Sequence, residues 1–281
     1  MDEQEIQTFW AEHPCGDSLV GGFDKERDSY EAFFSRYDRF RYEKEAHILP
    51  TLDRIRLAGK HLLEIGLGQG ADSEQLIRRG AAWSGVDLTA ASVERVRTRL
   101  ALRGLPYISL RQGSVLQLPF ESSSFDIVFS HGVLHHVPDV LTAQREIRRV
   151  LRADGELIVM LYAKWSLNYL ASIAIVRRIG LLGLYALGLK PGGIYGQHLT
   201  NAREIGLLRY LRLRNFIHRN TDGPLNPYSR LYDLRGVRRD FPNFVITKAY
   251  KQFMHAPPLP VEWLPMGRML GWHLWVHMRP I

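Results

Sequence analysis

Short apolar runs alternate with longer amphipathic segments through the middle of this chain. The apolar runs are bounded by glycine, proline and small polar residues, and they predict strands at residues 61–66, 83–87, 108–112, 125–130 and 156–162. Between them, apolar positions recur at helical spacing and predict helices over residues 72–79, 92–103 and 140–151. The continuous apolar run of 125–130 is typical of a parallel strand buried on both faces. Strands that alternate with helices in this way indicate an α/β protein.

The pattern resumes near the carboxyl terminus after a long interruption. Tyr228–Asp240 predicts a last crossover helix, and Phe244–Phe253 and Trp272–Met278 predict two more strands. We therefore divide the chain into an amino-terminal cap (1–48), a core (49–163), an insertion (164–227) and a carboxyl-terminal completion of the core sheet (228–281).

The insertion contains the most apolar stretch of the chain, Leu167–Leu189. Its length would span a bilayer, but Arg177 and Arg178 at its centre would each cost roughly 2.5–3.5 kcal/mol there. We predict instead one or two helices that pack over the carboxyl edge of the sheet as an apolar lid. The alternative is an interfacial helix on a membrane surface, through residues 167–189, with its arginines at the headgroups.

The amino-terminal segment is rich in aromatic residues. They recur at intervals of three and four through Ser29–His47, which predicts a helix there. Cys15 is the single cysteine, so an internal disulfide is excluded and a reducing compartment is favoured. The polar, acidic start of the chain is unlike a signal peptide, and we therefore expect a cytoplasmic protein.

A glycine-rich turn follows the first predicted strand. Gly66, Gly68 and Gly70 allow a sharp turn and close approach to a ligand, because no Cβ intervenes. Asp87 ends the second predicted strand, 21 positions after Gly66 (87 − 66), near the spacing of a carboxylate that bonds ribose hydroxyls. The pattern predicts a nucleoside site, although with Ala71 it also satisfies the dinucleotide fingerprint.

Glu64 changes this picture, because it lies at the carboxyl end of the first strand and faces the predicted ligand. A negative charge there suits a cation and repels a pyrophosphate. S-adenosylmethionine carries a sulfonium and an ammonium, whereas NAD carries a pyrophosphate. The charge therefore favours the methyl donor over a dinucleotide.

With these features the chain resembles the class I S-adenosylmethionine-dependent methyltransferases, in the broad group that includes the ubiquinone/menaquinone C-methyltransferases. The blocks that carry the resemblance follow one another in order over roughly residues 50–163: Leu62–Gly70, Gly85–Leu88, Gln117–Val128, Ser130–Pro138 and Arg149–Gly155. The resemblance implies a Rossmann-like, seven-stranded, mostly parallel sheet with helices on both faces, to which the helical cap and the helical insertion after the fifth strand are added.

The resemblance also implies roles for particular residues. The Gly66–Gly70 backbone should line the methionine and ribose, Glu64 should lie near the ammonium, and Asp87 should bond the ribose hydroxyls. Leu88 should lie against the adenine, and Ser130 should lie beneath the sulfonium. In the block Gly113-Ser114-Val115, Ser114 replaces the acid that binds the adenine amino group in relatives. Before the first strand, Tyr37, Arg41 and Tyr42 are candidates to contact the methionine carboxylate.

Two adjacent histidines are the candidate catalytic residues. His135 and His136 follow the fourth strand, and a histidine is a suitable general base for a hydroxyl, a phenol or an acidic carbon. We favour His135 of the two. Adjacent histidines point apart and no acid joins them at ligand spacing, so no metal site is predicted. Asn226 and Tyr228 either supply polar contacts in an apolar pocket or form a turn before a helix.

Three functions remain open at this point. The first is methylation of a small apolar or aromatic acceptor, such as a quinone, a terpenoid or another secondary metabolite, with S-adenosylhomocysteine as the by-product. The net charge of +8 allows an RNA methyltransferase, but the arginines are spread and no arginine and aromatic interleaving typical of RNA binding is seen. The third is a non-catalytic nucleoside-binding protein. The oligomeric state is left open by the sequence.

Overall fold

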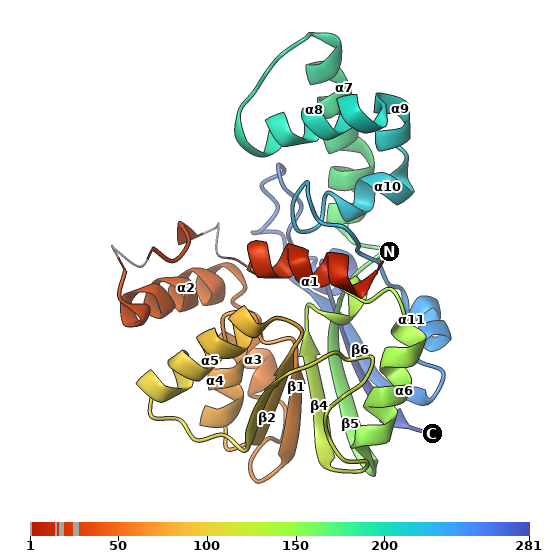
Figure 1. The fold of residues 1–281 in the computed structure, drawn as a ribbon. Helices are drawn as coiled ribbons and strands as arrows, with labels where there is room; N and C mark the ends of the chain where they lie inside the picture. Colours follow the sequence, from red (N-terminus) through yellow and green to blue (C-terminus); the bar gives the residue numbers. More distant parts are fainter. Residues whose placement is uncertain (1, 15, 17–19, 25–27) are drawn as a thin grey trace.

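A seven-stranded sheet forms the centre of the molecule (Figure 1). The computed structural model describes residues 2–14, 16, 20–24 and 28–281, so Cys15 lies outside the described residues. The strands are β1 (His61–Ile65), β2 (Ala82–Asp87), β3 (Ser109–Gln112), β4 (Phe125–His131), β5 (Leu151–Tyr162), β6 (Phe244–Gln252) and β7 (His273–Pro280). Their order is β3-β2-β1-β4-β5-β7-β6. β7 runs in the direction opposite to the other six strands, which are parallel to one another.

The predicted α/β fold with a mostly parallel sheet is confirmed. The strand order reverses between β1 and β4, and in open parallel sheets a ligand crevice lies outside the carboxyl ends at such a point. The glycine-rich turn after β1 therefore begins at this crevice.

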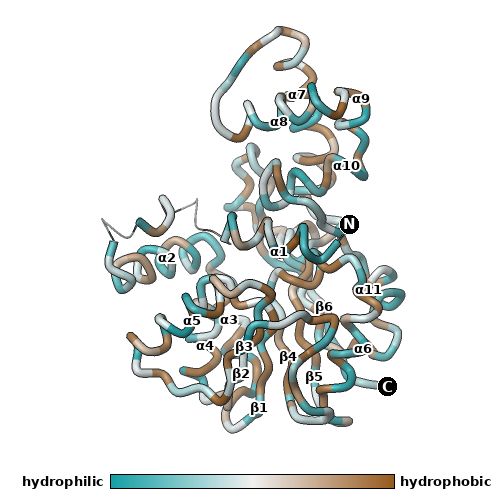
Figure 2. Tube along the Cα trace, viewed as in Figure 1, coloured by the Kyte–Doolittle hydropathy of each residue, from teal (hydrophilic) through white to brown (hydrophobic). Residues whose placement is uncertain are grey.

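Both faces of the sheet are buried, because successive strand residues point to opposite sides. Leu62 packs in the apolar core on one face and Leu63 in the core on the other. One face is covered by α3 (Ile48–Leu52), α4 (Ala71–Arg78) and α5 (Ala90–Leu102), and the other by α6 (Val140–Val150) and α11 (Leu234–Asp240) (Figure 1). Figure 2 shows the corresponding hydrophobic stretches along the central strands.

The last crossover helix is shorter than predicted. Asp233 caps α11 by accepting a hydrogen bond from the backbone N–H of Gly236 at 2.8 Å, so the helix begins at Leu234. Before it, the backbone N–H of Tyr232 donates to the carbonyl of Tyr162, and Tyr232 forms a bridge with Ala163. The beginning of the predicted helix is therefore extended chain along the end of β5.

The amino-terminal helices lie over the carboxyl ends of the strands and beside them. Helix α1 (Glu3–Glu12) crosses above the sheet in Figure 1, and α2 (Tyr30–Lys44) packs against α5. Helix α2 begins after Ser29, which accepts a hydrogen bond from the backbone N–H of Ala32.

The insertion forms a lobe that extends beyond the sheet rather than lying flat on it (Figure 1). A π-helical segment η3 (Asn168–Val176) continues into α7 (Arg177–Ala186), followed by α8 (Gly193–Ile205), α9 (Leu207–Tyr210) and α10 (Leu213–His218). The lobe has a small apolar core of its own, in which Ile173, Leu181, Leu199 and Phe216 meet Trp272 from the segment before β7. The short helices η2 (Leu134–His136) and α12 (Gly267–Leu270) complete the fold.

Candidate functional site

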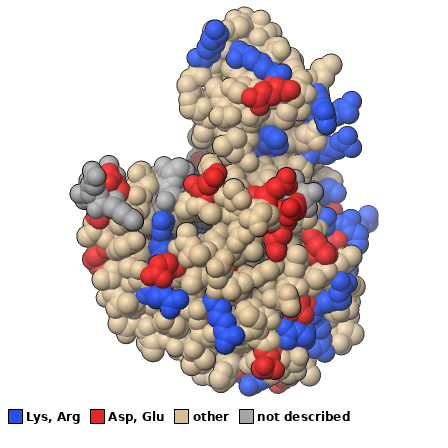
Figure 3. All heavy atoms as spheres, in the orientation of Figure 1, with Lys and Arg blue, Asp and Glu red and all other residues tan. Residues whose placement is uncertain are grey.

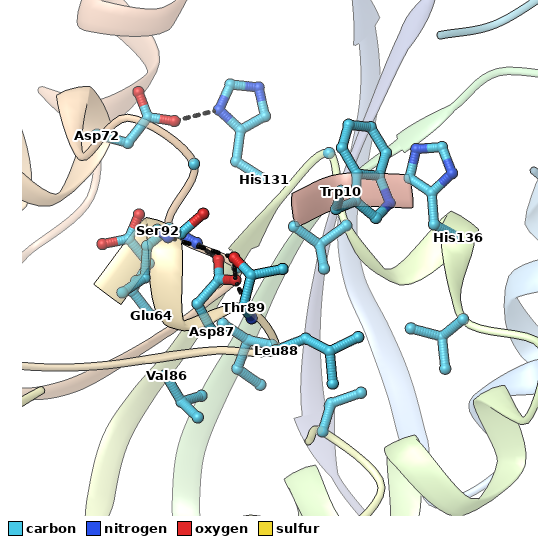
Figure 4. Close-up of a pocket in the computed structure, with 18 of the residues that line it drawn as sticks. Trp10, Glu64, Asp72, Val86, Asp87, Leu88, Thr89, Ser92, His131 and His136 are labelled. Atoms are coloured by element: carbon cyan, nitrogen blue, oxygen red, sulfur yellow. Dashed lines mark hydrogen bonds and ion pairs between the residues drawn. The ribbon is translucent and has the colours of Figure 1, made fainter. Parts of the chain in front are cut away.

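A cavity of about 280 Å³ lies at the carboxyl ends of β1, β2, β4 and β5. The loops after these strands form its floor, and α1 covers it with Glu3, Ile6 and Trp10. Figure 4 shows Trp10 on this helix beside the cavity. Between Tyr162 and Asp222, the described residues of the insertion contribute nothing to its lining. The predicted apolar lid is therefore wrong in this respect, because the helices of the insertion pack on one another in the separate lobe while α1 covers the cavity.

The glycine turn packs closely against the loop after β4. Gly66 has φ +78°, and a Cβ added there would lie 2.2 Å from a methyl carbon of Val133. Gly66 and Gly68 line the cavity, whereas Gly70 adopts a left-handed conformation that begins α4 and is absent from the lining. Any side chain at position 66 would fill the space between the turn and Val133.

Asp87 lines the cavity and organises the turn at the same time. Its carboxylate accepts the backbone N–H of Leu67 at 2.7 Å, and also the backbone N–H and the hydroxyl of Thr89 at 2.8 and 2.9 Å. Burial raises the pKa of Asp87, and these hydrogen bonds oppose the shift. Leu88 and Val115, the residues expected near the adenine, also line the cavity.

Ser114 is placed differently from the expectation. It does not line the cavity, and its hydroxyl donates to the carboxylate of Glu3 while accepting the backbone N–H of Leu116 at 2.9 Å. Glu3 itself lines the cavity. Position 114, where the resemblance led us to expect an acid, is a serine. An acid nevertheless lies beside it, because Glu3 of α1 contacts Ser114. No local sequence signal relates residue 3 to residue 114.

Glu64 is buried, with 2% of its surface exposed, and borders the cavity. Its carboxyl group accepts the indole N–H of Trp83 at 2.8 Å. Burial and the nearby charge of Asp72 raise the pKa of Glu64 to about 8, against the opposing hydrogen bond from Trp83. A cation bound in the cavity would favour the ionised form of this group.

A second buried acid, Asp72, is held by Arg41 and His131, and Figure 4 shows its contact with His131. Asp72 Oδ2 lies 2.6 Å from Arg41 Nη2 and 2.6 Å from His131 Nδ1. Burial would raise the pKa of Asp72, but the charges and hydrogen bonds of Arg41 and His131 outweigh it and hold the pKa below its ordinary value. Of the three candidates for the methionine carboxylate, Arg41 and Tyr37 line the cavity and Tyr42 does not.

The structure thus adds Asp72 and His131 to the residues that the sequence singled out. Their sequence signal was adjacency alone, since Asp72 opens the helix after the glycine turn and His131 follows Ser130. Ser130 is buried and donates to the carbonyl of Ile65 at 3.2 Å, so it supports the floor and does not line the cavity.

The two adjacent histidines occupy different environments. His136 lines the cavity beside Trp10, with ring centroids 5.0 Å apart (Figure 4). His135 is fully buried behind the cavity against Tyr162, with ring centroids 3.8 Å apart, and burial lowers its pKa well below the ordinary value. Our preference for His135 is therefore not supported by its position, because the turn of η2 directs His136 and not His135 to the cavity.

The insertion supplies an acid for His136. Asp222 Oδ2 lies 3.4 Å from His136 Nε2, and Asp222 Oδ1 accepts the hydroxyl of Tyr162 at 2.7 Å. Burial would raise the pKa of Asp222, but His136 and Tyr162 outweigh it and lower the pKa. The expectation that no acid joins the histidine pair is wrong, since ligand atoms of His135, His136 and Asp222 lie within 4.8 Å of one another.

Asn226 and Tyr228 hold this arrangement from outside the cavity. His136 Nδ1 lies 2.7 Å from the carbonyl of Tyr228, and the Asn226 amide donates to the Ser229 hydroxyl at 2.7 Å. Neither residue lines the cavity, so their role is the turn and not the pocket contact. The carbonyl of Tyr228 fixes the ring of His136 so that Nε2 faces Asp222.

The chain was compared with known families and proteins. Residues 63–159 match the family described as "Methyltransferase domain". The phthiotriol/phenolphthiotriol dimycocerosates methyltransferase of Mycobacterium leprae is 33% identical over 109 residues, which are 38% of this chain and 39% of that protein. The ubiquinone biosynthesis O-methyltransferase of Paracidovorax citrulli is 28% identical over 183 residues, 64% of this chain and 73% of that protein.

Solved structures with this fold extend the similarity beyond the matched domain. A SAM-dependent methyltransferase from Aquifex aeolicus superposes with a TM-score of 0.53 at 11% identity, covering 91% of this chain and 100% of that one. Geranyl diphosphate methyltransferase in complex with SAM superposes with a TM-score of 0.52 at 13% identity, covering 94% and 95%. At these identities the likeness shows the fold. The chain spans about two fifths of the Mycobacterium leprae protein and half of a malonyl-[acyl-carrier protein] O-methyltransferase from Halorhodospira halophila.

Proposed function

Because residues 63–159 form a class I S-adenosylmethionine-dependent methyltransferase domain, we propose that this chain transfers the donor's methyl group to a small apolar or aromatic acceptor. A quinone, a terpenoid or another secondary metabolite fits this description. Among the relatives, one protein's name refers to ubiquinone biosynthesis and another's to phenolphthiotriol dimycocerosates, which supports an acceptor with an apolar body.

The described lining of the cavity fits S-adenosylmethionine better than a dinucleotide. Against one arginine, Arg41, it presents seven acidic side chains: Glu3, Glu45, Glu64, Asp72, Asp87, Asp139 and Asp222. Glu64, with its pKa of about 8, joins the charged ones when a cation binds beside it. This charge favours a ligand with a sulfonium and an ammonium, and it opposes a pyrophosphate or an RNA backbone. The dinucleotide and RNA alternatives lose their support on this point.

Individual residues would hold the parts of the donor. The Gly66–Gly68 turn leaves room for the methionine and ribose, Asp87 offers lone pairs to the ribose hydroxyls, and Arg41 offers a cation to the methionine carboxylate. When bound, the donor supplies an electrophilic methyl group on a positively charged sulfur. The protein then has to align the acceptor, exclude water and receive a proton where the acceptor has one to lose.

The observation that carries the catalytic proposal is the pair formed by His136 and Asp222. It faces the cavity between Trp10 and Tyr162, so an acceptor's polar group would meet it while the aromatic rings contact the acceptor's apolar body. Asp222 stabilises the positive charge that His136 gains when the pair takes the acceptor's proton. This arrangement favours a hydroxyl, a phenol or an acidic carbon as the methylated group, and it favours an enzyme over a non-catalytic nucleoside-binding protein.

The pair can be tested separately from donor binding. We expect His136→Gln and Asp222→Asn to bind S-adenosylhomocysteine within about twofold of wild type but to lose about 100-fold or more in methyl transfer to a hydroxylated quinone. His61→Gln is the matched control, since His61 is exposed at the opposite end of β1. Calorimetry measures binding, and transfer of a radiolabelled methyl group measures turnover.

Two results would contradict the proposal. Full methyl transfer by both variants would remove His136 and Asp222 from catalysis. Failure of the wild-type protein to bind S-adenosylmethionine and S-adenosylhomocysteine would overturn the methyltransferase assignment itself.

We also propose that the enzyme acts in the cytoplasm, which the single cysteine of the chain supports.

A further inference from the structure

Nearly all of the net positive charge of the chain belongs to the insertion. Residues 164–227 contain nine lysines and arginines and two acids, Glu204 and Asp222, which gives +7. The whole chain has 37 basic and 29 acidic residues, so the remaining 217 residues have 28 and 27, a net +1. In Figure 3 the lobe formed by the insertion accordingly shows several blue groups and little red. The charge is a property of the lobe and not of the catalytic core.

The same lobe exposes large apolar side chains. One face of the helical stretch at η3 and α7 exposes apolar residues at helical spacing. These are Ile175 at the end of η3, and Ile179 and Leu182 on α7, and 65% of Ile179 is exposed. Further exposed apolar residues of the lobe are Leu187, Leu189, Ile194, Tyr195 and Leu208. Only 17% of the most apolar window in Asn168–Ala186 is buried, so this is not the core helix of a globular protein. Such a concentration of exposed apolar surface marks an interaction site.

Backbone carbonyls of the lobe and of the segment before β7 occupy both arginines in this helical stretch. Arg177 Nε donates to the carbonyl of Pro257 at 2.8 Å, and Arg178 Nε donates to the carbonyl of Leu211 at 2.9 Å. Ile173 and Leu181 are buried on the same side as Arg177. Although Asn168–Ala186 is long and apolar enough to cross a membrane by length and composition, one of its faces is committed to the lobe. Only the opposite face is free, which suits a helix that lies on a surface.

We propose that the lobe docks on a membrane that contains anionic lipids. The exposed face of α7 and the neighbouring apolar side chains would enter the interface. The exposed basic residues would meet the headgroups, and these are Lys190, Arg203, Arg209, Arg212 and Arg214. Apolar side chains combined with lysines and arginines are the pattern of interfacial helices on anionic lipid. A second copy of the chain is a poor occupant, because two lobes of +7 repel each other.

The loop that closes the insertion brings Asp222 to the cavity, so the lobe and the site are joined by one short segment. The docking itself does not depend on the proposed methyl transfer, and it can be measured without donor or acceptor.

The test is co-sedimentation of the full chain with vesicles. We expect binding to phosphatidylcholine vesicles that contain phosphatidylglycerol, with much weaker binding to phosphatidylcholine alone. Ile179→Glu should weaken binding about tenfold or more, since it places a charge in the interface. Ile108→Glu is the matched control, because Ile108 is 67% exposed, close to the 65% of Ile179, and lies before β3, outside the lobe.

The electrostatic part has its own pair of variants. Arg212→Gln combined with Arg214→Gln should weaken binding to the anionic vesicles about tenfold, and added salt should do the same. Arg235→Gln combined with Arg238→Gln removes two exposed charges from α11 and should leave binding unchanged.

Three outcomes would overturn the proposal. The first is an absence of binding to either kind of vesicle. The second is equal loss in the lobe variants and in their controls. The third is a stable dimer in light scattering that Ile179→Glu dissociates while no vesicle is bound, which would assign the apolar face to a second copy. Circular dichroism of each variant establishes that it is folded.

Discussion

At the scale of single residues, Glu64 combines burial with a charge that donor binding would use. Its carboxyl group has a pKa of about 8 because burial and Asp72 disfavour ionisation. In the unfolded chain the same group would ionise near its ordinary value of 4.5. Between these two values the folded state holds a proton that the unfolded state has lost. The contribution of Glu64 to stability is therefore fully present below about pH 4.5 and is lost as the pH rises through about 8.

Glu64→Gln should remove this pH dependence. Glutamine keeps an acceptor for the Trp83 indole but has no charge to gain, so at pH 5 the variant and the wild type should differ little. From pH 5 to 8 the variant should gain relative stability, by up to about 1.4 kcal/mol for each pH unit. Urea unfolding at several pH values measures the difference in unfolding free energy between the variant and the wild type. The contributions of the buried histidines cancel in this difference, because both proteins contain them.

The exposed Glu262 provides the control for this effect. Glu262→Gln should give a difference from wild type that does not change between pH 5 and 8. A flat difference for Glu64→Gln as well would show that Glu64 ionises normally in the folded protein.

The two histidines illustrate what residue spacing can and cannot predict. The sequence indicated a histidine at the site, because the loop after a strand of a parallel sheet meets the crevice. Which of the two reaches the cavity depends on the direction of η2, and His136 gains its acid from Asp222, 86 positions later (222 − 136). Neither relation produces a periodic pattern in the sequence. The histidine pair was therefore predicted, but the member that faces the cavity was not.

At the scale of elements, the strands were the best predicted part of the fold. Apolar runs mark strands of a sheet that is buried on both faces, and β1, β2 and β4 begin and end within a residue of their predicted bounds. The insertion was predicted as a lid because its apolar content required a partner. In the structure, the helices of the lobe pack on one another and bury part of this apolar surface themselves. The sequence pattern could not predict this packing, because it depends on contacts between distant segments.

Helix α1 is the element that closes the cavity, and two polar contacts hold it there. Glu3 accepts the hydroxyl of Ser114, and Gln7 donates to the carbonyl of Leu88 at 2.8 Å. Both partners belong to loops at the predicted adenine end. The amino-terminal helix thus supplies an acid beside Ser114, the position at which the resemblance implied one in the loop itself.

Glu3→Ala combined with Gln7→Ala should release α1 without unfolding the core. We expect S-adenosylhomocysteine to dissociate several-fold faster, because the helix no longer covers the cavity, while the melting temperature changes little. Glu12→Ala, on an exposed position of the same helix, should leave the dissociation rate unchanged. Stopped-flow displacement measures the rate, and equal rates in the double variant and wild type would exclude α1 as the cover.

At the scale of the whole molecule, the chain consists of a sheet with its cap and a lobe with a different chemical character. The cap and the sheet enclose an acidic cavity, whereas the lobe is basic and exposes apolar side chains. The two parts meet at Trp272, Tyr162 and Pro257, and the loop with Asp222 continues from the lobe into the cavity lining. This separation allows one part to bind the donor while the other contacts a surface.

Hydrogen exchange should report the separation directly. Addition of S-adenosylhomocysteine should slow exchange in α1 and in the turn after β1, since both line the cavity. Exchange in α7 and α8 should not change, because residues 163–221 contribute nothing to the described lining. Anionic vesicles should have the reverse effect, protecting α7 and leaving the turn after β1 unchanged. Donor-induced protection of α7 and α8 would show that the lobe closes over the cavity after all, and the lid predicted from the sequence would then describe the donor-bound state.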